Sequence, residues 1–189
     1  TKDGFGAIGH VDICYKGRII SFGNYDTNSE RLFGAMGDGV LFSADREKYI
    51  EFCKRENHKT LLGYGLALSP EQLAAVDKEI AKLMSLTVPW DPPKTVKPKR
   101  PGIDKEEPMY AYKLKQEADG RLYKFTSSKF KTYFVMSTNC VLLADTIVGA
   151  AGTDILSVRG FISPGTYQDY LDKEFERPHS LVVTKRVYQ

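Results

Sequence analysis

Polar and apolar residues alternate along residues 9–25 (GHVDICYKGRIISFGNY), in two short runs separated by Lys16-Gly17. Alternation of this kind on both sides of a turn signal predicts a β-hairpin. Successive side chains of a strand point to opposite faces of the sheet, so His10, Asp12 and Cys14 are expected to share one face of the first strand. His10 would then stand at the beginning of the strand, where a side chain can reach into a cleft.

Further along the chain, the pattern predicts both strands and helices. Residues 109–114 (MYAYKL) and 121–125 (RLYKF) predict a second hairpin around the turn signal Asp119-Gly120. Apolar residues at helical spacing predict helices at 43–57, 69–84 and 164–175, and a more apolar helix that starts at Cys140. The N-cap of the first of these helices is expected to be Ser43 or Asp45. The segments 60–68 and 180–187 are expected to be extended, and 154–158 is expected to be a strand or a loop.

The alternation of strands and helices predicts an α+β domain with a largely antiparallel sheet packed on helices. A chain of 189 residues is long enough for one core and short for two, so we expect one domain over 1–189. Residues at about 27–108 are interpreted as a mixed helical insertion. It begins with a glycine-rich loop at 26–39 and ends with an exposed proline- and lysine-rich connection at 89–108.

The composition excludes several classes of function. A net charge of +3 is too small to indicate nucleic acid as a partner, and no apolar run reaches the roughly 18 residues of a membrane span. Three cysteines are too few and too scattered for a disulfide framework or a zinc site, and we expect no cofactor and no metal. Apart from Cys140, the cysteines Cys14 and Cys53 are expected to be buried thiols, with one optional bridge as the alternative.

The stretch 137–152 (STNCVLLADTIVGAAG) carries the strongest chemical signal. A polar cluster ends in Cys140 and runs directly into an apolar segment, which places the thiol at or near a helix N-terminus. The positive end of the helix dipole favours a thiolate there, and the thiolate is the reactive form of cysteine. Cys140 is therefore the candidate nucleophile, although a buried structural thiol is the alternative.

His10 is the favoured base for this thiol. The other two histidines, His58 and His179, lie in segments that are expected to be at the surface. A histidine base needs a polar group that fixes its tautomer, and the second strand of the hairpin offers Ser21 by register and Asn24 by chemistry. The sequence does not decide between these two.

The polar neighbours of the two candidate catalytic residues, Asp12 and Asn139, are predicted to contact substrate. His10, Asp12 and Cys14 on one strand face could alternatively suggest metal ligands, but a single strand without a second ligand cluster is a weak signal. Asn139 is also a common helix-capping residue, and this is its simplest interpretation.

A histidine at the start of a hairpin strand (GHVDICYKGRIISFG), followed much later by an Asn-Cys pair that opens an apolar helix (STNCVLLADTI), resembles the circularly permuted papain-like hydrolases. This superfamily includes permuted NlpC-like cell-wall peptidases and the relatives of lecithin:retinol acyltransferase. The resemblance implies Cys140 as nucleophile, His10 as general base and a polar orienting residue closest to Ser21, where many relatives have histidine. It also implies that the backbone N–H of Cys140 contributes to the oxyanion hole.

From this resemblance we expect a cysteine hydrolase that cleaves an amide, most specifically a peptide bond in bacterial peptidoglycan. A lipid acyl hydrolase or acyltransferase with the same dyad and a non-catalytic binding domain are the alternatives. An inhibitor protein is a possible partner. The sequence begins with Thr1, and we expect a mature or trimmed form from the bacterial cell envelope or the secreted fraction, with any targeting segment removed.

Overall fold

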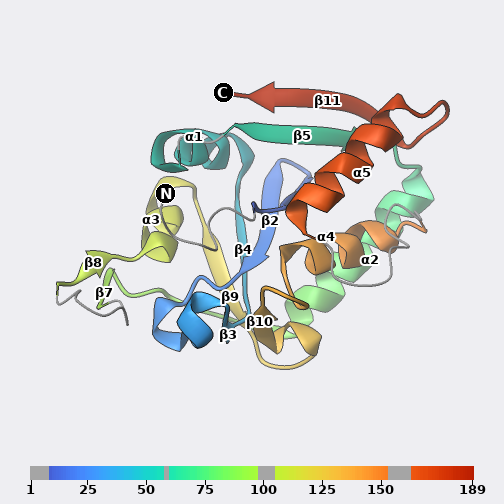
Figure 1. The fold of residues 1–189 in the computed structure, drawn as a ribbon. Helices are drawn as coiled ribbons and strands as arrows, with labels where there is room; N and C mark the ends of the chain where they lie inside the picture. The colour runs from blue at the N-terminus through green and yellow to red at the C-terminus, as the bar shows by residue number, and fades with distance from the viewer. Residues whose placement is uncertain (1–8, 58–59, 98–104, 153–162) are drawn as a thin grey trace.

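The structure is a computed structural model that describes residues 9–57, 60–97, 105–152 and 163–189. Helices and strands are interspersed along the chain (Figure 1). The helices are α1 (Arg46–Asn57), α2 (Pro70–Ser85), α3 (Tyr110–Glu117), α4 (Cys140–Gly149) and α5 (Pro164–Glu176), with short 3-10 turns at Thr27–Ser29, Leu32–Gly34 and Lys129–Lys131. The strands are β1 (Ile13–Tyr15), β2 (Arg18–Gly23), β3 (Met36–Asp38), β4 (Val40–Asp45), β5 (Leu61–Leu66), β6 (Thr87–Pro89), β7 (Thr95–Val96), β8 (Glu107–Pro108), β9 (Arg121–Phe125), β10 (Thr132–Phe134) and β11 (Val182–Tyr188).

A five-stranded antiparallel sheet with the order β1-β2-β4-β9-β6 organises the fold. Its first two strands form the predicted hairpin, with Ile13 opposite Ile20. The turn residues Lys16 and Gly17 both have positive φ angles of 48° and 74°, which matches the backbone of a tight two-residue hairpin turn. The predicted α+β class with antiparallel strands is confirmed.

Both faces of this sheet are covered by helices, which explains why its inner strands are apolar on both sides (Figure 1). One face carries Ile19, Val40 and Phe42 and packs with residues of α1 and α3 in one buried cluster. The other face carries residues such as Phe22 and Leu41 and packs with α2 and α4 in a second cluster. The N-terminus of α4 is thereby held close to the hairpin.

Three two-stranded sheets surround this body. β3 pairs with β10, and this pair leads the chain toward the start of α4. β5 pairs with β11 in a long ribbon beside α5, and β7 pairs with β8 within the proline- and lysine-rich connection. No helix in the described part of the chain is long and apolar enough to cross a membrane.

Two helices begin as their sequence signals predict. Ser69 caps α2 in a full capping box with Gln72, and Pro70 is the first helical residue. Ser163 caps α5 by accepting a hydrogen bond from the backbone N–H of Thr166. These signals are local, so they do not depend on how the rest of the chain packs.

The predicted strand at 109–114 is wrong, since Tyr110–Glu117 is the helix α3. Its buried residues Ala111, Leu114 and Ala118 have the spacing of one helical face, and burial of that face against α1 and the sheet outweighs the short alternation of MYAYKL. The turn at Asp119, with a φ of 50°, therefore joins a helix to β9 and does not close a hairpin.

Of the two N-caps predicted for the first helix, Ser43 is wrong and Asp45 is confirmed. Residues 40–45 form β4, and α1 begins at Arg46, where the Asp45 carboxylate accepts a hydrogen bond from the backbone N–H of Lys48. β4 pairs with both β2 and β9, so the segment interpreted as an insertion at about 27–108 supplies the middle strand of the sheet. The predicted strand or loop at 154–158 lies outside the described residues.

Candidate active site

Cys140 is the first residue of α4, as the sequence predicts, and the residue before it caps the helix. Asn139 Oδ1 accepts a hydrogen bond from the backbone N–H of Leu142 (3.1 Å), and its Nδ2 donates one to the carbonyl oxygen of Val135 (3.1 Å). Asn139 is thus held at both ends of its amide and is buried. This cap fixes the Cys140 thiol at the positive end of the helix dipole.

The segment that leads into β1 lies against the start of α4. Val11 packs in one cluster with Cys140, and its backbone N–H and the charge of His10 both lower the pKa of the Cys140 thiol. Gly9 has a φ of 84°, and a Cβ atom there would lie 3.3 Å from the Cβ of Pro164 at the start of α5. A glycine therefore allows the chain to approach the start of α5 closely.

Three oxygen atoms surround the Nε2 atom of His10. Ser21 Oγ lies 2.7 Å away, Asp12 Oδ1 2.9 Å and Tyr25 Oη 3.1 Å. Ser21 Oγ and Tyr25 Oη are also within 3.0 Å of each other. Nε2 is therefore the ring nitrogen that meets the polar cluster. The imidazole therefore joins a polar cluster to a thiol.

The Asp12 carboxylate is held from its other side by α1. Tyr49 Oη donates a hydrogen bond to Asp12 Oδ2 (2.8 Å). The contact of Oδ1 with His10 is a charge contact, since no donor meets Oδ1 at hydrogen-bonding geometry within the described residues. Burial raises the pKa of Asp12, but the charge of His10 and the polar contacts with His10, Ser21 and Tyr49 lower it, and the net pKa lies below the ordinary value.

The charges of this cluster favour an ion pair between the imidazole and the thiol. Burial lowers the pKa of His10, but the charges of Asp12 and Cys140 raise it, and the net pKa lies well above 6.5. Burial raises the pKa of Cys140, whereas the charge and hydrogen bond of His10 lower it, and the net pKa lies below its ordinary value. Both shifts stabilise a thiolate next to an imidazolium.

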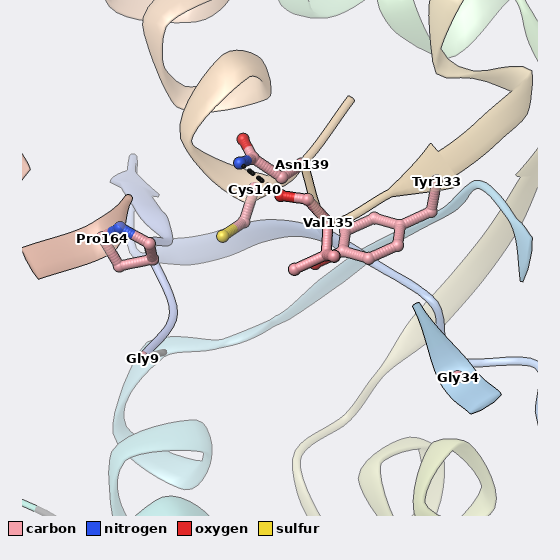
Figure 2. A pocket seen from close by; sticks show the side chains of 7 residues that line it. All are labelled: Gly9, Gly34, Tyr133, Val135, Asn139, Cys140 and Pro164. Carbon is pink, nitrogen blue, oxygen red and sulfur yellow. Dashed lines mark hydrogen bonds between the residues drawn. The ribbon is translucent and has the colours of Figure 1, made fainter. Parts of the chain in front are cut away.

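The thiol opens onto a small cavity. Its volume is about 80 Å³, and its lining consists of Gly9, Gly34, Tyr133, Val135, Asn139, Cys140 and Pro164. Figure 2 shows the Cys140 sulfur between Pro164 on one side and Val135 with Tyr133 on the other. The Cys140 residue is only 4% exposed, while 35% of the His10 side chain is exposed. A reactant would therefore reach the sulfur through this cavity, beside His10.

The structure brings four of the six predicted site residues together: His10, Asp12, Ser21 and Cys140. Asn24 does not lie in this cluster, since its Nδ2 donates to the carbonyl oxygens of Gly34 and Met36, and a Cβ atom on Gly37 would collide with its amide. Asn139 serves as the helix cap and lines the cavity at the same time.

The other two cysteines are free, as Cys140 is. Cys53 is buried as predicted, but the prediction of a buried thiol is wrong for Cys14, which is exposed on the short outer strand β1. Among the described residues, no group of three or more histidine, cysteine and acidic side chains has the arrangement of a metal site.

Tyr25 and Tyr49 belong to the cluster and escaped the sequence analysis. Tyr49 lies in α1 among apolar residues, and it is buried there with its hydroxyl donating a hydrogen bond to Asp12. A buried tyrosine usually finds a partner for its hydroxyl, so its presence in an apolar stripe is a signal for a polar neighbour. The identity of that neighbour depends on the packing of α1 against the hairpin.

Comparisons of the chain with protein-family models, with curated proteins and with solved structures find no match.

Proposed function

We propose that this protein is a cysteine hydrolase that cleaves an amide bond through Cys140 and His10. The observation that carries the proposal is a buried thiol at the capped N-terminus of α4, packed against the segment that follows His10, with the pKa of His10 raised and that of Cys140 lowered by their charges. A lowered thiol pKa next to a histidine is typical of nucleophilic cysteines.

In the first half-reaction the Cys140 thiolate attacks the carbonyl carbon and forms a C–S bond. The imidazolium of His10 donates its proton to the amide nitrogen as the C–N bond breaks, and the amine leaves. The product on the enzyme is a thioester at Cys140. The backbone N–H of Cys140, at the start of α4, is the donor proposed for the oxyanion.

In the second half-reaction, neutral His10 takes a proton from water, and the resulting hydroxide attacks the thioester. The C–S bond breaks, the carboxylic acid leaves, and the thiolate returns beside the imidazolium. One amide and one water thus yield one acid and one amine.

The order of the residues supports the permuted papain-like relationship. The histidine precedes the cysteine in the chain, the histidine segment leads into an antiparallel hairpin, and the cysteine opens an apolar helix on the same sheet. Under this proposal the substrate is a peptide bond in bacterial peptidoglycan. That choice of substrate rests on analogy with relatives of the superfamily.

The direct test is incubation with purified peptidoglycan, with Cys140→Ser as the matched inactive variant. We expect soluble peptides, detected by mass spectrometry with new amino termini, to appear with the unmodified protein. Their rate should fall at least ~1,000-fold in Cys140→Ser, because the serine hydroxyl is not ionised by the same histidine. Equal release by both proteins would contradict the proposal.

One observation favours a second candidate function, hydrolysis or transfer of a lipid acyl chain. Leu32 and Phe33 are 62% and 98% exposed and directly precede Gly34 of the cavity lining, and Met136 is 52% exposed next to Val135 of the same lining. Large apolar side chains exposed beside a reactive thiol suit a substrate with an apolar chain.

The two candidates are separated with phospholipid vesicles and the variant Phe33→Asn. Phe33 has a φ of 56°, a conformation that asparagine tolerates, so this variant retains the loop backbone. A lipid substrate predicts fatty-acid release that falls at least about tenfold in Phe33→Asn, because an exposed phenylalanine contributes on the order of 1.5–3 kcal/mol when it is buried against acyl chains. Peptide release without fatty-acid release would leave the amide hydrolase.

A further inference from the structure

We propose that Asp12 is the residue that orients His10 and stabilises the positive charge of its imidazolium form, and that Tyr49 holds Asp12 in place for this role. The proposal rests on the proposed function, and it goes beyond the resemblance, which places the orienting residue at Ser21. It also replaces the expectation that Asp12 contacts substrate.

Three oxygens compete for a single proton on the His10 ring. Nε2 of His10 carries one hydrogen at most and faces Ser21 Oγ at 2.7 Å, Asp12 Oδ1 at 2.9 Å and Tyr25 Oη at 3.1 Å. The two hydroxyls can each donate or accept, so they suit either protonation state of the ring. Of the three groups, only the carboxylate favours the imidazolium by its charge.

Both oxygens of the Asp12 carboxylate have neighbours that fix the side chain. Asp12 precedes the first strand residue Ile13 by one position, so its side chain stays on the same side of the extended segment as His10. Its Oδ2 accepts from Tyr49 Oη at 2.8 Å, and Tyr49 is buried in α1. One oxygen therefore faces the imidazole and the other is fixed by a rigid element, which leaves neither oxygen available to a substrate.

Ser21 contacts the His10 ring without contributing a charge. This residue is 1% exposed on β2, and its Oγ touches both His10 and Tyr25. A buried hydroxyl between two polar atoms positions the ring but carries no charge. We therefore assign Ser21 to positioning, and Asp12 to the stabilisation of the positive charge that His10 carries before it protonates the leaving group.

The titratable groups that face His10 are Asp12 on its own segment, Cys140 on α4, Tyr25 after β2 and Tyr49 on α1, which acts through Asp12. Both tyrosines have raised pKa values because of burial and then the charge of Asp12, so they stay neutral at ordinary pH. Charge changes near the ring thus come from Asp12 and Cys140.

The test measures the proton affinity of His10 by the pH titration of its ring C–H signal in NMR spectra. The chain has three histidines, so His10 is assigned by its loss in His10→Gln, and exposed His179 serves as an internal reference. The titration is carried out with Cys140→Ser as the background, which removes the charge of the thiolate and isolates the contribution of Asp12.

We expect Asp12→Asn to lower the proton affinity of His10 at least about tenfold, since an opposite charge this close shifts a histidine by one pKa unit or more. Asp12→Glu keeps the charge and should restore part of the affinity. Ser21→Ala should change it less than about threefold, and Tyr49→Phe, which keeps the ring and is the variant most compatible with folding, should give an intermediate loss.

An unchanged His10 titration in Asp12→Asn, or a larger loss in Ser21→Ala than in Asp12→Asn, would overturn the assignment. Because the thiol is absent from this background, such a result would leave the proposed nucleophile intact. Conversely, an ordinary pKa of Cys140 in the unmodified protein would remove the proposed function, whatever the histidine titration shows.

Discussion

Two clusters of charged and polar side chains in this fold each contain one basic group between acidic ones. In the Lys124 cluster, Nζ of Lys124 lies 2.6 Å from Asp26 Oδ2 and 2.9 Å from Asp38 Oδ2, and the Trp90 ring lies 5.1 Å from Nζ. In the His10 cluster, the imidazole lies between Asp12 and the Cys140 thiol.

The difference between them is what the basic group faces. The Lys124 ammonium group contacts two carboxylates and an aromatic ring. The second oxygen of Asp26 accepts a hydrogen bond from the backbone N–H of Asn28. His10 contacts the oxygens around its Nε2 atom, and its charge also acts on a nucleophile that opens onto a cavity. Burial and charge are common to both clusters, so it is the open nucleophile that marks the second one as a reactive site.

Lys124→Met is expected to have the largest effect, and this effect should fall on stability and not on the reactivity of Cys140. This change leaves Asp26, which is only 6% exposed, without its cation, and we expect the free energy of unfolding at pH 7 to fall by about 2 kcal/mol. The alkylation rate of Cys140 should stay within twofold. Urea denaturation followed by circular dichroism measures the first quantity, and Lys129→Met serves as the control at an exposed lysine.

The pH dependence of that stabilisation has a definite sign. Burial lowers the pKa of Lys124, but its contacts with Asp26 and Asp38 raise it above 10.5 overall. The contribution of a raised lysine is complete below its unfolded pKa and is lost as the pH rises through the folded value. The stability difference between the unmodified protein and Lys124→Met should therefore be flat from pH 6 to 9 and shrink only above about pH 10.5. A difference that shrinks between pH 6 and 9 would contradict this account of the Lys124 cluster.

A smaller effect is expected from Asn139→Ala, which acts on both stability and the thiol. Loss of the cap should lower the free energy of unfolding by about 1 kcal/mol, because the N–H of Leu142 and the carbonyl oxygen of Val135 lose their partner. The alkylation rate of Cys140 at pH 6 should fall a few-fold as the helix end frays. Asn139→Ser, which can cap the helix, is the matched control, and a rate that falls equally in both variants would argue against the capping role.

The smallest effect is expected from Tyr25→Phe. The ring keeps its contact with Phe42, whose centroid lies 5.0 Å away, and only the hydroxyl between Ser21 and His10 is removed. Because Ser21 and Asp12 still surround Nε2, the loss of unfolding free energy should stay near 0.5–1 kcal/mol. A thermal midpoint that falls by more than about 8 °C would give Tyr25 a larger structural role than this.

Local signals in the sequence were sufficient for much of the fold. The hairpin at Lys16-Gly17, the capped start of α2 and the start of α4 at Cys140 each depend on a few neighbouring residues. By contrast, β4 and α3 depend on packing from both sides of the sheet, and a short apolar run such as 40–45 does not distinguish a central strand from a helix start.

The site divides in the same way. Cys140 and Ser21 were placed by local pattern, a helix start and a strand register. The alternation predicts Asp12 on the same face as His10, but its contacts with the imidazole and with Tyr49 depend on how this segment packs against α1. The choice between Ser21 and Asn24 also required the fold, since Asn24 turns to the loop at Gly34.

The proposed ion pair between His10 and Cys140 is tested by the pH profile of Cys140 alkylation by iodoacetamide. Cys14→Ser removes the exposed competing thiol, and peptide mapping follows Cys140. An ion pair predicts a rate that stays high well below pH 8.5 and a profile in His10→Gln that moves above pH 8.5, since burial and the charge of Asp12 then raise the pKa of the thiol without the opposing charge of His10. A midpoint near 8.5 in both proteins would contradict it.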